Sequence, residues 1–126
     1  MKLFNPKYAI AAFAIILFFS WKKQTQINGK WKELGGKNTS TFHDIIKSIT
    51  IDTTGNVYAA GRFVNDYGNC YIAKWNGMAW SEQGGSNGST FNNEIRNIAI
   101  DAKGNVFATG SFMNTRGNYF VAEYKQ

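Results

Sequence analysis

Two stretches of the chain alternate apolar and polar residues, and this alternation predicts β-strands. Ile49 and Ile51 alternate with polar neighbours, which is the two-residue period of a strand with one buried face. The sequence DTTGN at 52–56 favours a tight turn, because aspartate and asparagine side chains bond nearby backbone groups and glycine adopts positive φ easily. Small or apolar residues then occupy every second position over 57–63. The pattern therefore predicts two antiparallel strands joined by a turn.

Two further short strands are predicted downstream. The segment CYIAKW at 70–75 has the composition of a half-buried strand. The dipeptide Asn76–Gly77 follows it and is a strong signal for a β-hairpin. The segment AWSEQ at 79–83 then provides the fourth strand. Four short strands so close together in sequence indicate one small antiparallel sheet.

The same pattern recurs 49 residues later in the chain. When residues 31–77 are aligned with residues 80–126 without gaps, 22 of the 47 positions are identical. The shared positions include residues that we assign to structural turns: Asp52, Gly55 and Asn56 in the first copy, and Asp101, Gly104 and Asn105 in the second. Glycines and apolar spacing coincide in the two copies, so the chain contains two copies of one supersecondary unit.

The stretches IDTTGNVYAAGRF and IDAKGNVFATGSF carry a family resemblance. They resemble the bacterial β-propeller repeats of the seven-bladed beta-propeller repeat type, which have a D-x-x-G-N-V-Y-x-x-G signature. The resemblance covers residues 31–126, and it implies an all-β fold of two four-stranded antiparallel blades, a partial β-propeller with units 31–79 and 80–126. Members of such families are mostly exported or surface proteins, so the resemblance also implies an extracytoplasmic location.

Two blades are too few to close a ring, because propellers typically have about four to eight. We therefore expect one of three outcomes. Chains could assemble head to tail into a ring of about three or four chains. The two units could instead pack as a small sandwich. The chain could also be a fragment of a longer propeller protein. The segment Trp31–Leu34 matches the last strand of a blade and could complete another blade.

The first residues of the chain have the pattern of a targeting segment. Lysines flank an apolar run from Tyr8 to Phe19. The run is shorter than the roughly 20 apolar residues that span a bilayer, and it fits the apolar region of a secretory signal. We expect residues 1–21 to form a signal peptide or membrane-anchor helix and residues 22–30 to form a linker. The protein would then be periplasmic, membrane-associated or on the surface of a bacterium.

The net charge of +6 does not indicate a nucleic-acid-binding surface. Five of the 14 basic residues precede Trp31, and the remaining nine are matched by all eight acidic residues. A nucleic-acid-binding protein concentrates positive charge on its folded surface. The distribution here fits a segment near a membrane instead, and we expect no nucleic-acid partner.

The sequence contains little that indicates catalysis. Cys70 and His43 are each the only residue of their type, so neither a disulfide, a zinc site built from cysteines nor a repeated histidine-based triad is available. The segment GNVYAAG lacks the lysine of a phosphate-binding loop. The turn DTTGN offers one carboxylate, whereas a calcium site needs several oxygen ligands. We therefore expect no enzyme activity, no cofactor and no metal.

Binding is the better expectation. The aromatic residues Trp31, Trp75 and Trp80 could stack on sugar rings, while Arg62 and Glu82 could bond their hydroxyl groups. The alternative is that these aromatic residues fill the core of each blade. The expected function is thus an exported interaction module whose partner is a second copy or another propeller-containing chain. A carbohydrate-binding, lectin-like propeller is the main alternative.

Overall fold

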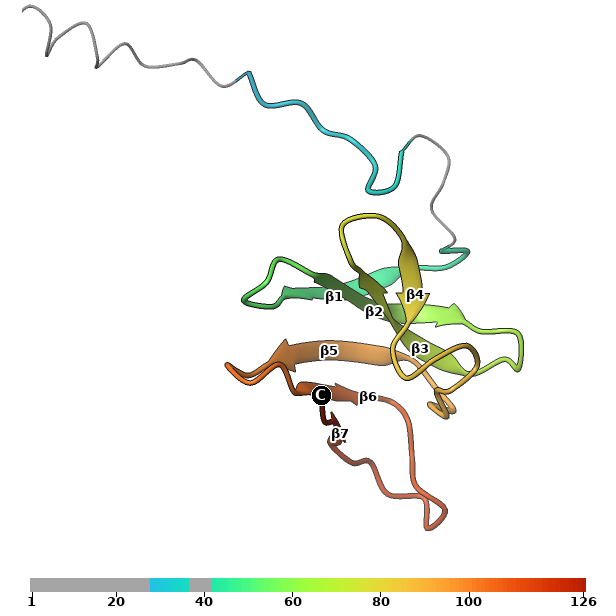
Figure 1. Cartoon of the computed structure of the whole chain (residues 1–126). Coiled ribbons are helices and arrows are strands. Elements are labelled where there is room, and N and C mark those ends of the chain that lie inside the picture. The colour runs from blue at the N-terminus through green and yellow to red at the C-terminus, as the bar shows by residue number, and fades with distance from the viewer. Residues whose placement is uncertain (1–27, 37–41) are drawn as a thin grey trace, which may run out of the picture. The chain divides into compact units, whose positions relative to one another are not determined.

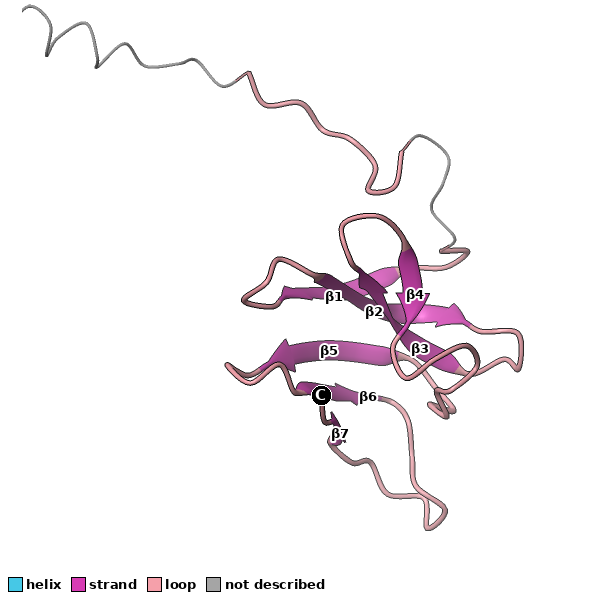
Figure 2. Cartoon of the chain, viewed as in Figure 1, coloured by secondary structure: helices cyan, strands magenta, loops and turns pink. Residues whose placement is uncertain are grey.

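The computed structural model describes residues 28–36 and 42–126 (Figure 1). The chain divides into two units, Met1–Trp31 and Lys32–Gln126. The described residues contain strands, turns and loops (Figure 2), and within them no helix has the length and apolar character needed to cross a membrane. The expected signal or anchor helix at residues 1–21 lies outside the described residues.

The first sheet is an antiparallel meander. Its strands are β1 (Ile46–Ile51), β2 (Val57–Val64), β3 (Cys70–Trp75) and β4 (Trp80–Glu82), in the order β1-β2-β3-β4. Each strand pairs antiparallel with the next one along the chain. These are the four strands that alternation and the turn residues predict.

The second sheet has three strands. They are β5 (Ile95–Ile100), β6 (Val106–Gly110) and β7 (Ala122–Tyr124), again antiparallel and in sequence order. The all-β prediction is confirmed, but the prediction of two four-stranded sheets is wrong for the second one. The residues equivalent to β4 would follow 49 positions after it, which lies beyond Gln126.

The third strand of each sheet also differs in length. β3 begins at Cys70, whose N–H donates to the carbonyl of Phe91 at 2.9 Å. The equivalent residue in the second sheet, Tyr119, forms only an isolated bridge with Met113, and β7 begins three residues later. The Phe91 carbonyl belongs to the connection that leads from the first sheet to the second. Cys70 also pairs with Val64 of β2 after a register shift, whereas the equivalent pair of Tyr119 and Met113 is separate from the β6–β7 ladder.

The repeated turns have the same hydrogen bonds in both sheets. In the first, the Asp52 carboxylate accepts bonds from the backbone N–H of Asn56 at 2.9 Å and from its side-chain amide at 2.7 Å. In the second, Asp101 accepts the same two bonds from Asn105 at 2.9 and 2.8 Å. Desolvation raises the pKa of Asp52, but these bonds and those from Thr54 outweigh it and hold the pKa well below its ordinary value. Each turn is therefore fixed by an ionised carboxylate.

Glycine occupies the middle of both turns for a conformational reason. Gly55 has a φ of 90° and Gly104 a φ of 89°, which lies in the region that other L-residues rarely adopt. The N–H of each glycine donates to the carbonyl of the turn aspartate, at 3.1 and 3.0 Å. The sequence spacing from aspartate to glycine thus determines the sharp reversal between the first two strands of each sheet.

The core of the second unit lies between the two sheets. β5 packs against β1 and β2 (Figure 1). Tyr58, Ala60 and Ile72 form one face of the first sheet, and they share a buried cluster with Ile98 and Val106 of the second sheet. Burial of such apolar side chains stabilises the pair by roughly 1.5–3 kcal/mol for each large one. The two sheets therefore form one packed layer pair.

Two polar contacts accompany this apolar packing. The Lys47 ammonium of β1 lies 2.8 Å from a carboxylate oxygen of Glu94, which directly precedes β5. The N–H of Ile98 donates to the hydroxyl oxygen of Ser48 at 3.2 Å. Both contacts join β1 to the β5 region and set the position of one sheet on the other.

Two isoleucines of β1 are exposed on the opposite face of the first sheet, on which Ala59 and Ala73 are buried. Ile46 and Ile49 are 44% and 64% exposed, whereas their equivalents Ile95 and Ile98 are 0% and 8% exposed. On the far face of the second sheet, Val121 is 65% exposed, whereas its equivalent Ile72 is 4% exposed. Apolar positions that are buried between the sheets in one copy of the repeat are therefore exposed on the outer face of the other copy.

Candidate functional site

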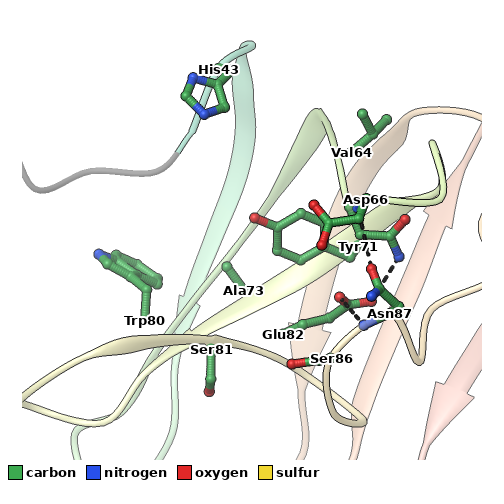
Figure 3. A pocket seen from close by; sticks show the side chains of 11 residues that line it. His43, Val64, Asp66, Tyr71, Ala73, Trp80, Ser81, Glu82, Ser86 and Asn87 are labelled. Atoms are coloured by element: carbon green, nitrogen blue, oxygen red, sulfur yellow. Dashed lines mark hydrogen bonds between the residues drawn. The ribbon is translucent and has the colours of Figure 1, made fainter.

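A pocket of about 290 Å³ opens beside β3 and β4 (Figure 3). Ala73 of β3 pairs with Glu82 of β4, and Trp75 pairs with Trp80, so these side chains share one face of the sheet. Turns on either side supply the rest of the wall. The lining residues are His43, Val64, Asn65, Asp66, Tyr71, Ala73, Trp80, Ser81, Glu82, Ser86 and Asn87.

Glu82 is held by several hydrogen bonds in the wall of this pocket. Its carboxylate accepts hydrogen bonds from the Asn65 amide at 3.1 Å and from the backbone N–H groups of Asn87 and Ser89 at 2.8 and 2.9 Å. Desolvation raises the pKa of Glu82, but these bonds outweigh it and lower the pKa below its ordinary value. Glu82 therefore holds the loop after β4 onto the β2–β3 turn as an ionised group.

Asn87 makes a second bond across the same boundary. Its side-chain oxygen accepts a bond from the N–H of Asp66 at 3.2 Å, and Figure 3 shows it beside Glu82. Asn87 is also the only non-glycine residue with a positive φ among the residues that the structure describes. Its unusual backbone conformation is therefore supported by bonds from both its backbone and its side chain.

Of the predicted binding aromatics, one lines this pocket. Trp80 lines the pocket, and its ring lies 5.6 Å from that of Trp75 and 5.0 Å, edge-on, from that of Phe42. Trp75 is not part of the pocket wall, and Trp31 is fully exposed. The aromatic contacts of Trp80 match the alternative in which these rings pack within the sheet.

The predicted polar binding residues also separate. Arg62 lies on β2 with an exposed side chain, 3.8 Å from the Asp44 carboxylate, and does not line the pocket. Glu82 lines it, but its carboxylate already accepts the three bonds described above. The structure thus brings Trp80 and Glu82 together on the pocket wall, with Trp75 packed behind Trp80 and Arg62 outside the pocket. Trp31 belongs to the other unit of the chain.

Sequence reasoning did not assign Tyr71, Asp66, Asn87 or His43 to a site. Tyr71 packs edge-on against Phe63 at 4.8 Å, and the equivalent pair in the second sheet is Phe120 and Phe112 at 4.9 Å. An aromatic residue at the same position of both copies is a signal that the alignment contained. Asp66 and Asn87 reach the pocket from loops, where Asn87 is bonded both to Glu82 and to the N–H of Asp66.

A second cavity, of about 320 Å³, lies between the two sheets. Its apolar walls come from both: Ile72 of β3, Val106 and Ala108 of β6, and Ala122 and Tyr124 of β7. Phe91, Phe120 and the loop around Gly84 and Ser89 complete it. This cavity corresponds in part to the first pocket, because Phe120 and Ala122 are the equivalents of Tyr71 and Ala73.

The two cavities differ in the chemical groups that line them. The first pocket offers hydrogen-bonding groups beside two aromatic rings, and the second is mainly apolar. Within residues 28–36 and 42–126, no three histidine, cysteine, aspartate or glutamate side chains gather where they could hold a metal ion. Cys70 is buried, and desolvation followed by the nearby Glu94 and Asp44 carboxylates raises the pKa of its thiol.

Comparisons with known proteins give no match for this chain. No family model matches it, and neither a curated protein nor a solved structure does. What the chain does must therefore be argued from its two sheets, their faces and their cavities.

Proposed function

We propose that the chain is an exported, propeller-type binding module without catalytic activity, whose sheets associate face to face with sheets of another chain. The proposal treats each sheet as one blade. The observation that carries it is the packing within the chain, where the Tyr58 and Ile72 face of the first sheet covers the Ile98 and Val106 face of the second.

The same two kinds of face occur at the outside of the pair. The exposed residues Ile46 and Ile49 correspond to residues that are buried in the second sheet, and exposed Val121 corresponds to buried Ile72. Two different apolar faces that match each other favour head-to-tail association rather than a two-fold dimer. A ring of about three or four chains would contain a typical number of blades.

The native mass of the full chain tests this proposal. We expect a discrete oligomer, and we expect Ile49→Asp to shift the equilibrium to monomers by at least about tenfold, because an uncompensated charge on an apolar face is strongly unfavourable. Thr53→Asp adds the same charge at an exposed turn position and should leave the oligomer intact. A wild-type chain that is monomeric at every concentration would refute the association.

The pocket beside β4 favours a second function, carbohydrate binding. Tyr71 and Trp80 present aromatic rings, and Asp66 and Asn87 present polar groups, which together match the aromatic and hydrogen-bonding character of a small-molecule site. Glycan-array binding by the full chain would test this. We expect Asp66→Ala to abolish retention with an unchanged circular dichroism spectrum, while Lys103→Ala, at an exposed turn, should have no effect. Unchanged retention by Asp66→Ala would exclude this pocket.

A further inference from the structure

We propose that the segment Trp31–Glu33 of one chain adds to the free edge of β7 in a second copy, as the fourth strand of that copy's second sheet. The inference rests on the proposed function, since it names the partner and a contact through which the sheets associate. Four observations support it: an open strand edge, a preformed donor turn, complementary charges and a cavity at the required place.

The open edge belongs to β7. In the first sheet, residues 73–75 of β3 pair with residues 80–82 of β4. The equivalent residues of the second sheet, 122–124, pair with β6 on one side, and no strand of the described chain pairs with their other side. Backbone N–H and C=O groups on an open edge are a template for another strand.

The donor segment is the repeat equivalent of β4. Residues 31–33 read WKE where β4 reads WSE, and they form no strand in the structure. The turn after them is nevertheless that of β4: the N–H of Gly36 donates to the carbonyl of Glu33 at 3.1 Å, as in the equivalent bond after β4. The φ angles of Gly35 and Gly36 are 96° and 104°, against 92° and 93° after β4. The segment therefore has the local geometry of a fourth strand.

The register of the first sheet places complementary groups together. Transferred to β7, it sets Lys32 opposite Glu123 and Trp31 opposite Tyr124. Both Lys32 and Glu123 are exposed. A directly opposed pair of unlike charges stabilises an antiparallel strand pair. The first sheet has Lys74 opposite Ser81 at this position, so the charge pair is specific to the proposed contact.

The inter-sheet cavity lies where the incoming tryptophan is expected. Trp80 of β4 contacts the rings of Phe42 and Trp75. The equivalents of those two residues are Phe91 and Tyr124, and both line the cavity of about 320 Å³. The Trp31 side chain, at the Trp80 position of the second sheet, would therefore fill apolar space between them.

The repeat geometry requires that donor and acceptor belong to different copies. The chain runs 13 residues from Glu82 to Ile95, where the sheet containing β5 packs on the sheet that β4 completes. It also runs 13 residues from Glu33 to Ile46, so the sheet that receives residues 31–33 should lie on the exposed Ile49 face of the first sheet. The chain's own second sheet lies on the opposite face, with Tyr58 and Ile72.

Cysteine cross-linking between two full-length variants tests the proposal. One chain carries Lys32→Cys and the other Glu123→Cys, and the mixture is oxidised mildly. We expect a disulfide-linked dimer joining positions 32 and 123, identified by peptide mass spectrometry. Its yield should exceed that of the control mixture by at least about tenfold, because a disulfide requires Cα atoms within about 7 Å. The control replaces Glu123→Cys with Lys103→Cys, at an exposed turn. Native Cys70 is buried and present in every mixture.

Each outcome of the cross-linking decides the proposal. Yield at the control level would overturn it, and if native mass still shows an oligomer, face-to-face association stands without strand addition. An intramolecular disulfide in the Lys32→Cys/Glu123→Cys double variant at high dilution would show that residues 31–33 reach β7 of their own chain, and would overturn the proposal that the partner is a second copy. Charge reversal provides an independent measurement. Lys32→Glu should weaken the oligomer severalfold, and adding Glu123→Lys should restore it. Failure of restoration would overturn the proposed register.

Discussion

The two sheets are built from nearly the same sequence pattern, yet the same positions are buried in one and exposed in the other. Ile95 and Ile98 of β5 lie in the core, whereas Ile46 and Ile49 of β1 face outward. The alternation of residues is equivalent in both strands, and so is the turn that follows. The repeat therefore specifies strand geometry, while burial depends on whether another sheet lies against that face.

A second difference concerns polar groups. Glu94, before β5, bonds to Lys47 and Arg96, whereas the equivalent position before β1 is Ile45. Tyr58 of the first sheet corresponds to Phe107 of the second. The two copies thus differ in sequence at these two positions, where one sheet contacts the other. Four predictions test the comparison of the two sheets, from the largest expected effect to the smallest.

Shortening equivalent isoleucines to alanine should give the largest difference in stability loss between the two sheets. Ile95 is fully buried, so Ile95→Ala should lower the free energy of unfolding by about 2–5 kcal/mol through lost burial and cavity formation. Ile46→Ala, at the equivalent exposed position, should lower it by about 1 kcal/mol or less. Chemical denaturation at low protein concentration measures both. Equal losses would show that the Ile46 face is covered within a single chain.

Two glycines should respond alike in both sheets. A Cβ added at Gly61 would collide with the carbonyl oxygen of Ile45, and one at Gly110 with that of Glu94. Gly61→Ala and Gly110→Ala should each lower the free energy of unfolding by about 1–3 kcal/mol, because the backbone must shift. Gly29→Ala, where nothing lies within 4 Å, should change it by less than about 0.5 kcal/mol. An effect in only one sheet would mean that the two close approaches are not equivalent.

Tyr58→Phe gives the first sheet the residue type that the second sheet has at the equivalent position, Phe107. The Tyr58 hydroxyl donates to the Asp52 carboxylate at 3.2 Å and accepts a bond from the Gln126 amide at 3.3 Å. Tyr58→Phe should lower the free energy of unfolding by about 0.5–1.5 kcal/mol. Tyr67→Phe, at an exposed turn position, is the matched control and should have almost no effect. An unchanged Tyr58→Phe stability would mean that neither bond contributes.

Glu94 should give the smallest effect, visible as a pH dependence. Bonds from Lys47 and Arg96 lower the pKa of Glu94 from 4.5 to about 2. Since the folded state has the lower pKa, ionised Glu94 stabilises the fold above about pH 4.5, and this contribution is lost as the pH falls toward 2. The stability difference between wild type and Glu94→Gln should shrink over that interval in denaturation curves. A difference that is independent of pH would contradict this assignment.

The strands and turns could be predicted because their causes are local. The spacing from Asp52 to Asn56 fixes a turn through bonds within five residues, and its repeat at Asp101 does the same. The length of β7 could not be predicted in this way. β3 begins at Cys70, which pairs with Val64 after a register shift, whereas the equivalent pair of Met113 and Tyr119 is an isolated bridge. The alternation of residues within the strands is the same in both copies and does not contain this difference.

The candidate site was only partly predictable for the same reason. Trp80 and Glu82 share a face of β4, which alternation shows directly. Asp66 and Asn87 join them through the loop bonds to Glu82, which depend on the folded connection after β4. Trp75 packs beside Trp80 without lining the pocket, and Arg62 lies on β2 outside it, which residue type alone could not indicate.

The boundary of the sequence repeat does not coincide with the boundary of a sheet. Trp80 begins the second copy in sequence, but β4 completes the first sheet through its bonds to β3. An in-frame duplication or deletion of one 49-residue unit in the gene would therefore change the number of sheets by one, because each unit contains the last strand of one sheet and the first three strands of the next.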